Sequence, residues 1–163
     1  MSETPMPDFY QAGQYRPEQS VGYLMNKVLS SILAQAEIQL APYKLTYVQW
    51  LPLYKLLGCE RSTLASLARD LSVDPAALTR SLSRLESKGL IRRERCTLDR
   101  RVVHLSLTEE GRAVAVHVPG VLAHVLNSHL SGFQHDEWQQ LLHSLTRMLR
   151  NGEAMKSGPN ASS

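Results

Sequence analysis

Five arginines occur within ten residues of the segment RRERCTLDRR, at positions 92–101 of the 163-residue chain. A guanidinium group carries several N–H donors in one rigid plane, an arrangement that suits phosphate and carboxylate oxygens. Surface solubility alone requires far fewer charges than this short segment contains. We therefore expect the segment to contact a polyanion through Arg92, Arg93, Arg95, Arg100 and Arg101.

The positive charge of the chain is concentrated around this segment. The whole chain has a formal net charge of +3. Residues 80–101 carry eight basic and three acidic side chains, a net charge of +5, so the rest of the chain has a net charge of −2. A basic patch on a slightly acidic body is typical of nucleic-acid binding proteins, because it attracts the phosphate backbone.

Several other classes of protein are disfavoured. No segment approaches the run of about 20 apolar residues that a membrane-spanning helix requires, and the N-terminus lacks signal-peptide features, so we expect a cytoplasmic protein without membrane association. Cys59 and Cys96 are far apart and form no C-x-x-C motif, so we expect free thiols, no metal and no cofactor. The histidines form no H-E-x-x-H motif, and G-x-S-x-G and phosphate-loop motifs are absent, so we do not expect an enzyme.

The first half of the chain is predicted to be helical after an N-terminal arm. Three prolines and a glycine make residues 1–17 a poor helix. Apolar residues at helical spacing then predict a helix over residues 18–40, followed by a second helix that Thr46 caps and Gly58 ends. Pro52 lies inside this second helix, where it would kink the helix or destabilise it.

Two short helices and a hairpin are predicted next. The first helix begins at Ser62 or Thr63, and the second has a strong start signal, an N-cap Asp74 followed by proline, and runs to about Lys88. A connection of about four residues between two such helices is the spacing of a helix-turn-helix unit. Beyond Gly89, residues 90–96 and 102–107 predict two strands on either side of TLDRR.

The last third of the chain is predicted to be helical again. This helical region begins at Thr108, which we assign as an N-cap, and is interrupted at Pro119 and Gly120. A final amphipathic helix covers residues 135–149. We expect a flexible tail over residues 151–163.

The second helix of the helix-turn-helix unit has two different faces. Its leucines form an apolar stripe that must pack on the core, whereas its other face is small and polar. Small side chains allow close approach to a DNA major groove, where arginine can pair with guanine O6 and N7. Arg80 and Arg84 by themselves would favour an ordinary solvated face, but the helix-turn-helix spacing, the local charge and the basic hairpin favour DNA. The candidate DNA-binding residues are Thr63, Ala76, Thr79, Arg80, Ser83, Arg84, Lys88, Arg100 and Arg101.

This order of elements resembles the MarR family of winged helix-turn-helix regulators over nearly the whole chain. The resemblance rests on LTYVQWLPL at residues 45–53, LTRSLSRLESKGLIRRE at residues 78–94 and DRRVVHLSLTEEG at residues 99–111. It implies a mainly α fold with a small β-hairpin wing and N- and C-terminal dimerisation helices. It also implies that Asp99 holds Arg101 by an ion pair, while Arg100 or Arg101 reaches the minor groove. The wing turn TLDRR is compact for this role.

The resemblance and the residue pattern together predict four regions. Residues 1–17 form the arm, residues 46–108 the DNA-binding domain, residues 18–45 and 109–150 the dimerisation helices, and residues 151–163 the tail. A homodimer would place two recognition helices about 34 Å apart on a palindromic operator in double-stranded DNA. We place its interface on the terminal helices, whose apolar residues could alternatively pack within one chain. They include Val21, Leu24, Trp138, Leu142 and Leu145.

The family resemblance further implies a ligand-responsive transcriptional regulator. We expect a repressor that a small aromatic carboxylate or phenolic effector releases from its operator, with an effector pocket near the junction of the dimerisation and DNA-binding regions. Aromatic residues at helical spacing are also common in cores. The candidate effector-binding residues are Arg16, Tyr23, Asn26, Tyr47, Trp50 and His117.

Three alternatives remain open from the sequence. A repressor of the same fold could sense thiol oxidation through Cys59 or Cys96, although neither has an activating neighbour in sequence. A zinc-linked regulator could use His117 and His124, which lie two helical turns apart. A sequence-neutral architectural protein would also carry a basic patch, and would bind random duplexes as well as any operator.

Overall fold

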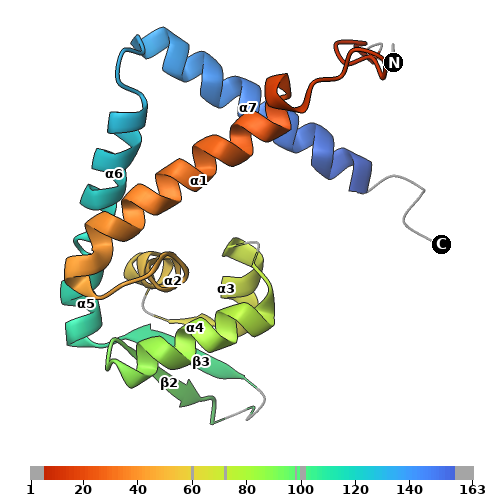
Figure 1. The fold of residues 1–163 in the computed structure, drawn as a ribbon. Helices are drawn as coiled ribbons and strands as arrows, with labels where there is room; N and C mark the ends of the chain where they lie inside the picture. The colour runs from red at the N-terminus through yellow and green to blue at the C-terminus, as the bar shows by residue number, and fades with distance from the viewer. Residues whose placement is uncertain (1–5, 60, 72, 98, 100–101, 157–163) are drawn as a thin grey trace. The chain divides into compact units, whose positions relative to one another are not determined.

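The computed structural model describes residues 6–59, 61–71, 73–97, 99 and 102–156, and describes the backbone but not the side chain of Tyr47. The chain forms two compact units, residues 1–125 and residues 126–163. Figure 1 shows α2, α3 and α4 gathered beside a small sheet in the first unit. The elements are η1 (Pro17–Gln19), α1 (Val21–Leu40), η2 (Ala41–Tyr43), α2 (Tyr47–Leu57), β1 (Ser62–Thr63), α3 (Leu64–Leu71), α4 (Pro75–Ser87), β2 (Ile91–Arg95), β3 (Val103–Leu107), α5 (Glu109–Ala115), α6 (Val118–His129) and α7 (His135–Lys156).

The sheet has three antiparallel strands in the order β1-β3-β2. Ile91 pairs with Leu107 and Arg95 pairs with Val103, so β2 and β3 form the predicted hairpin. The additional strand β1 pairs with the other edge of β3. The sequence predicts a helix start at these two residues, because a strand this short leaves no alternating pattern. The mainly helical fold class with a small β-hairpin wing is confirmed.

Helices α2, α4 and α5 begin after the predicted N-cap residues Thr46, Asp74 and Thr108, whereas α1 begins after Ser20, later than the predicted start at residue 18. Ser20 Oγ accepts a hydrogen bond from the Tyr23 amide at 3.2 Å, and Asp74 Oδ2 accepts one from the Ala77 amide at 2.8 Å. Each cap satisfies an amide that has no partner within its helix. The arm contributes in the same way, because Tyr10 Oη accepts from the Val21 amide at 3.0 Å.

The N-cap of α5 also connects the wing to α4. Thr108 Oγ1 accepts from the Gly111 amide at 2.9 Å and donates to the Gly89 carbonyl at 2.6 Å. Gly89 has φ of +71°, the left-handed conformation that commonly ends a helix. A Cβ atom at Gly111 would lie 1.8 Å from the Leu90 carbonyl oxygen, so only glycine fits there. Thr108 and Gly111 therefore have structural roles at the start of α5.

Two predictions for the C-terminal half are wrong in position. The helical region breaks at Val116 and His117, before the predicted break at Pro119 and Gly120. Pro119 instead lies in the first turn of α6, where its missing N–H would have no helical partner in any case. The last helix runs to Lys156 rather than Leu149, so residues 151–156 are helical and not part of a flexible tail. Residues 157–163 lie outside the described residues.

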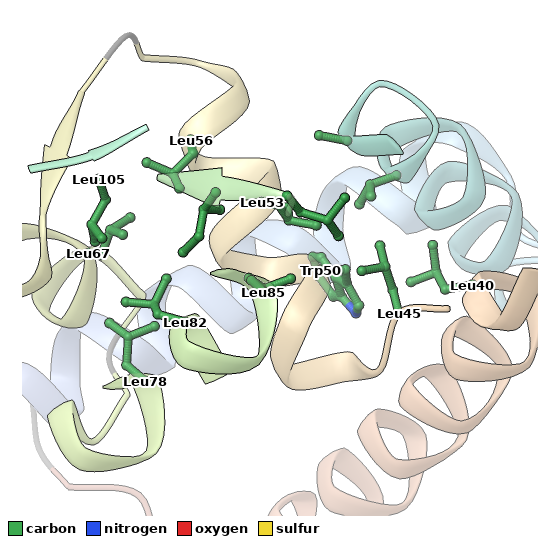
Figure 2. Close-up of a cluster of buried hydrophobic side chains, with 14 of the residues drawn as sticks. Leu40, Leu45, Trp50, Leu53, Leu56, Leu67, Leu78, Leu82, Leu85 and Leu105 are labelled. Atoms are coloured by element: carbon green, nitrogen blue, oxygen red, sulfur yellow. The ribbon is translucent and has the colours of Figure 1, made fainter. Parts of the chain in front are cut away.

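The hydrophobic core of the first unit joins the end of α1, α2, α3, α4, the sheet, α5 and the start of α6. Figure 2 shows leucines from these elements around Trp50. Burial of these side chains is the main favourable contribution to folding. The fully buried leucines of this cluster, with less than 2% exposure, are Leu40, Leu53, Leu56, Leu67, Leu82, Leu85 and Leu105.

Pro52 is accommodated inside α2 by a contact from α4. Proline has no N–H, so the carbonyl four residues earlier, at Val48, loses its helical donor. The buried Ser81 of α4 supplies a replacement, because its Oγ donates to the Val48 carbonyl at 2.5 Å. Helix α2 is continuous through Pro52. The proline inside α2 thus leaves a carbonyl free to accept a hydrogen bond that holds α4 against α2.

We predict that Ser81→Ala lowers the free energy of unfolding by about 1–2 kcal/mol, because it leaves the Val48 carbonyl without a donor. In a Pro52→Ala background the cost of Ser81→Ala should fall below about half of this value, since an alanine at this position restores the helical N–H. Urea unfolding of the four proteins at one protein concentration measures both quantities. Equal cost of Ser81→Ala in both backgrounds would contradict this explanation.

Candidate nucleic-acid interface

The buried stripe of α4 determines which of its side chains face outward. Leu78, Ser81, Leu82 and Leu85 are buried against the core. On the other side of the helix, Thr79 is half-buried and the remaining residues are exposed. The structure therefore brings most of the predicted DNA-binding residues to one face, formed by Ala76, Thr79, Arg80, Ser83, Arg84 and Ser87.

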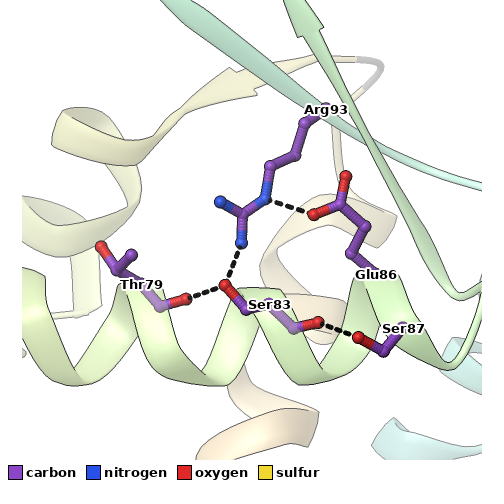
Figure 3. Close-up of polar contacts among 5 residues, drawn as sticks. All are labelled: Thr79, Ser83, Glu86, Ser87 and Arg93. Carbon is purple, nitrogen blue, oxygen red and sulfur yellow. Dashed lines mark hydrogen bonds and ion pairs between the residues drawn. The ribbon is translucent and has the colours of Figure 1, made fainter.

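Three hydroxyl groups on this face are bonded to the helix backbone. Thr79 Oγ1 donates to the Pro75 carbonyl at 2.8 Å, Ser83 Oγ to the Thr79 carbonyl at 3.0 Å and Ser87 Oγ to the Ser83 carbonyl at 2.9 Å. Each bond reaches the carbonyl four residues earlier, a common arrangement for Ser and Thr within helices. The last two of these bonds are drawn in Figure 3.

Arg93 connects the wing strand β2 to α4. Its Nε lies 2.9 Å from Glu86 Oε2, and its Nη2 donates to Ser83 Oγ at 2.9 Å. The Arg93 side chain is 27% exposed and that of Glu86 is 45% exposed. Figure 3 shows the guanidinium group reaching from the strand toward the helix surface. The prediction that Arg93 contacts a polyanion like the other four arginines does not include this contact with α4.

A signal for the Arg93 contact is present in the sequence. A strand that follows a helix after a glycine turn must fold back along it, and Glu86 and Arg93 flank Gly89 with opposite charges. Another strand residue, Glu94, pairs with Arg61 at 3.7 Å, but both side chains are more than half exposed. Such a surface pair contributes little to stability.

The wing exposes further cations, Arg92 and Arg95, on β2. At its turn, the Val102 amide donates to the Asp99 carbonyl at 3.0 Å, and the Cys96 amide donates to the Val102 carbonyl at 2.9 Å. Arg100 and Arg101 lie outside the described residues. The predicted ion pair between Asp99 and Arg101 and the predicted minor-groove contact therefore remain predictions.

Two other candidate DNA-binding residues make contacts within the chain. Thr63 Oγ1 accepts from the Ser66 amide at 3.1 Å and so caps α3. Lys88 Nζ donates to the Lys44 carbonyl at 2.5 Å and to Gln49 Oε1 at 2.7 Å. The Lys88 ammonium thus connects the end of α4 to the start of α2, which gives it a structural role that sequence spacing did not indicate.

The candidate effector-binding residues differ in burial. Trp50 belongs to the core and is 7% exposed, whereas Arg16, Tyr23 and Asn26 are exposed. The exposed ring of His117 stacks on Tyr43, with centroids 4.9 Å apart. The side chain of Tyr47 is not among the described parts of the chain.

An apolar cavity of about 60 Å³ lies between α2, α3 and α4. None of the candidate effector-binding residues lines it, and its lining includes Val48, Leu51 and Leu71. It is far below the roughly 300 Å³ of small ligand sites.

Cys59 and Cys96 are free, half-buried thiols. Among the described residues, no group of three or more His, Cys, Asp or Glu side chains could hold a metal ion. None of the described helices is both long and apolar enough to cross a membrane.

The model of the MarR family matches residues 45–103, from the start of α2 to the first residue of β3. A cysteine-to-serine variant of MarR from E. coli, solved in complex with operator DNA, is 30% identical to this chain. The alignment covers 79% of this chain and 93% of that one, with a TM-score of 0.72. The chain belongs to the MarR family.

Two further solved structures are similar to this chain. The reduced form of E. coli MarR is 28% identical, with 80% of this chain and 96% of that chain covered and a TM-score of 0.70. BpsR from Bordetella bronchiseptica, whose DNA binding is regulated by 6-hydroxynicotinic acid, is 23% identical, with 78% and 97% covered and a TM-score of 0.72. The likeness to BpsR establishes the fold alone.

Proposed function

We propose that this MarR-family protein is a transcriptional regulator that reads a DNA major groove with the outward face of α4 and an adjacent minor groove with its wing. The main observation that supports this proposal is that only some of the cations on and beside α4 have partners within the chain. Arg93 and Lys88 are bonded within the chain, whereas Arg80 and Arg84 on the outward face form no hydrogen bond or ion pair with the described residues. These two guanidinium groups are available for phosphate oxygens or guanine edges.

The proposal includes a homodimer on a palindromic operator. Helix α7 has 22 residues, yet none of its described residues is buried within the chain. Helix α1 buries only Ala36 and Leu40 of its 20 residues. Helices with so much exposed apolar surface favour association with another protein surface. In a homodimer, the same helices of a second copy would cover this surface. The exposed apolar residues include Val21, Leu24, Met25, Val28, Leu29, Leu141, Leu142, Met148 and Leu149.

We further propose that the regulator is a repressor that a small aromatic carboxylate or phenol releases from DNA. The ligand must bind the DNA-incompatible arrangement of the dimer more tightly than the DNA-bound one, because only differential affinity shifts the equilibrium. Arg16 is the proposed carboxylate partner. It lies beside the exposed aromatic residues Tyr10 and Tyr15 in a cavity of the arm. The regulation of BpsR by an aromatic acid supports the ligand class.

We predict that Arg80→Ala and Arg84→Ala each weaken operator binding by about 1–3 kcal/mol and relax base preference. Arg101→Ala should weaken binding and flatten its salt dependence, because one fewer phosphate is neutralised. Anisotropy titrations at two salt concentrations, on an operator obtained by random-sequence selection, measure these effects. Arg112→Ala on α5 is the control for loss of one positive charge. Unchanged affinity of all three variants would reject the interface, and a specificity ratio below about a thousand would favour an architectural protein.

We expect light scattering to give a particle of twice the 18.3 kDa chain mass. Leu142→Asp should shift this particle toward the monomer, because a carboxylate at the centre of an apolar interface is strongly unfavourable. Gln140→Asp introduces the same charge on another side of α7 and should leave the dimer intact. A wild-type monomer at the concentrations that bind operator would contradict the dimer proposal.

A thermal-shift screen of benzoate, 4-hydroxybenzoate, 6-hydroxynicotinate and phenol tests the effector proposal. An aromatic acid at 100 times its Kd should stabilise the folded protein by about 2.7 kcal/mol and should also release operator DNA. Arg16→Gln should weaken binding of the acids but not of phenol, which lacks the carboxylate. If no compound both stabilises the protein and releases DNA, the effector class is wrong.

A further inference from the structure

We propose that Arg93 sets the base specificity of α4 by fixing the direction of the Ser83 hydroxyl group. In this arrangement Ser83 presents a hydrogen-bond acceptor to the major groove and selects a base with an exocyclic amino group, adenine or cytosine. The inference rests on the proposed function, because it assumes that α4 enters the groove. It assigns Arg93 as a positioning residue and Ser83 as the residue that reads the base.

The argument begins with the capacity of a hydroxyl group. A serine oxygen has one proton to donate and two lone pairs that accept. Arg93 Nη2 donates to Ser83 Oγ at 2.9 Å and occupies one lone pair. A guanidinium group has no acceptor, so the Ser83 proton cannot point toward Arg93. Among the described residues, the other partner of Ser83 Oγ is the Thr79 carbonyl, which accepts the Ser83 proton at 3.0 Å. Ser83 is left with one free lone pair and no free proton.

A second contact with α4 helps to hold the Arg93 guanidinium group in place. Arg93 Nε lies 2.9 Å from Glu86 Oε2, so two contacts to α4 determine its orientation (Figure 3). Glu86 lies one helical turn beyond Ser83, and both contacts come from a single side chain of β2. The contact with Glu86 is an ion pair that does not have hydrogen-bond geometry, whereas the contact with Ser83 is a hydrogen bond. The wing strand therefore constrains a polar group on the recognition face.

The neighbouring hydroxyls provide an internal comparison. Thr79 and Ser87 also donate to carbonyls four residues earlier, but no donor among the described residues contacts their oxygen atoms. Nothing prevents these two hydroxyls from rotating to donate to a phosphate or a base. Ser87 is an exposed serine like Ser83 but has no contact with Arg93, which makes it a matched control.

This restriction selects between bases by the chemistry of the major-groove edge. Adenine N6 and cytosine N4 are donors, whereas guanine O6 and N7 and thymine O4 are acceptors. The free lone pair of Ser83 can bond only to the donors. Opposite guanine or thymine, Ser83 would have to break its bond to the Thr79 carbonyl and rotate while Arg93 remains bound.

The test measures affinity for every single base-pair substitution of a selected operator. Comparison of wild type with Ser83→Ala identifies the base pair that Ser83 reads. We expect adenine or cytosine there, preferred over guanine or thymine by about tenfold, and no such preference in Ser83→Ala. Replacing that base by purine or 2-pyrimidinone, which lack the amino group, should cost wild type about fivefold and Ser83→Ala nothing.

Arg93→Met tests the positioning role. It should weaken binding to all duplexes, because a cation is lost, and should also reduce the preference at the Ser83 base pair to below about threefold, since the hydroxyl can then donate or accept. Ser87→Ala should leave preference at that base pair unchanged. Circular dichroism establishes whether Arg93→Met is folded. If it is not, the exposed Ser83→Ala variant and the modified bases decide the question alone.

The outcomes separate the two proposals. Absence of sequence-specific duplex binding by wild type would overturn the proposed function and this inference together. Specific binding with guanine or thymine preferred at the Ser83 base pair would overturn only the inference. The same holds if Ser83→Ala alters no base preference, or if folded Arg93→Met keeps the full amino-group preference.

Discussion

The packing of α4 on α2 and the core determines which side chains form the proposed DNA-binding surface. Leu78, Leu82 and Leu85 are nearly or fully buried, so α4 cannot rotate about its axis without exposing them. The bond from Ser81 to the Val48 carbonyl adds a directional constraint to this apolar stripe. Because the helix is fixed in this way, its opposite face must present the small and cationic side chains that suit a major groove. A helix-interior proline in α2 is thereby part of the positioning of α4.

The basic character of residues 80–101 divides into structural and available charges. Arg93 forms an ion pair with Glu86, and Lys88 donates hydrogen bonds to Lys44 and Gln49 at the start of α2. These two cations therefore stabilise the packing of α4 against β2 and α2. Exposed arginines on α4 and β2 carry the charge that DNA phosphates would meet. Net charge locates this basic region, but a count of charges treats both groups as equal. The two groups differ in whether each cation has a hydrogen-bond acceptor or an ion-pair partner within the described chain.

The wing is attached to the helices at three places around Gly89. Thr108 donates to the Gly89 carbonyl, the Thr108 amide donates to the Leu90 carbonyl, and Gly111 lies against the same Leu90 carbonyl. Arg93 adds the contact from β2 back to α4. These hydrogen bonds and packing contacts link α4 and β2 to the start of α5. They leave the described wing strands little freedom to move independently of α4.

The features that depend on near neighbours are evident in the sequence: the helix starts after Thr46, Asp74 and Thr108, the leucine stripe of α4, and the hairpin. Caps, helical periodicity and turns involve residues a few positions apart, so their signals survive in a linear pattern. Only the tertiary structure revealed strand β1, the bond between Ser81 and Val48, and the inward bonds of Lys88. These join residues that are 33 to 44 positions apart. A hydrogen bond depends on the distance and direction between two atoms, and for such remote residues only the folded chain specifies either.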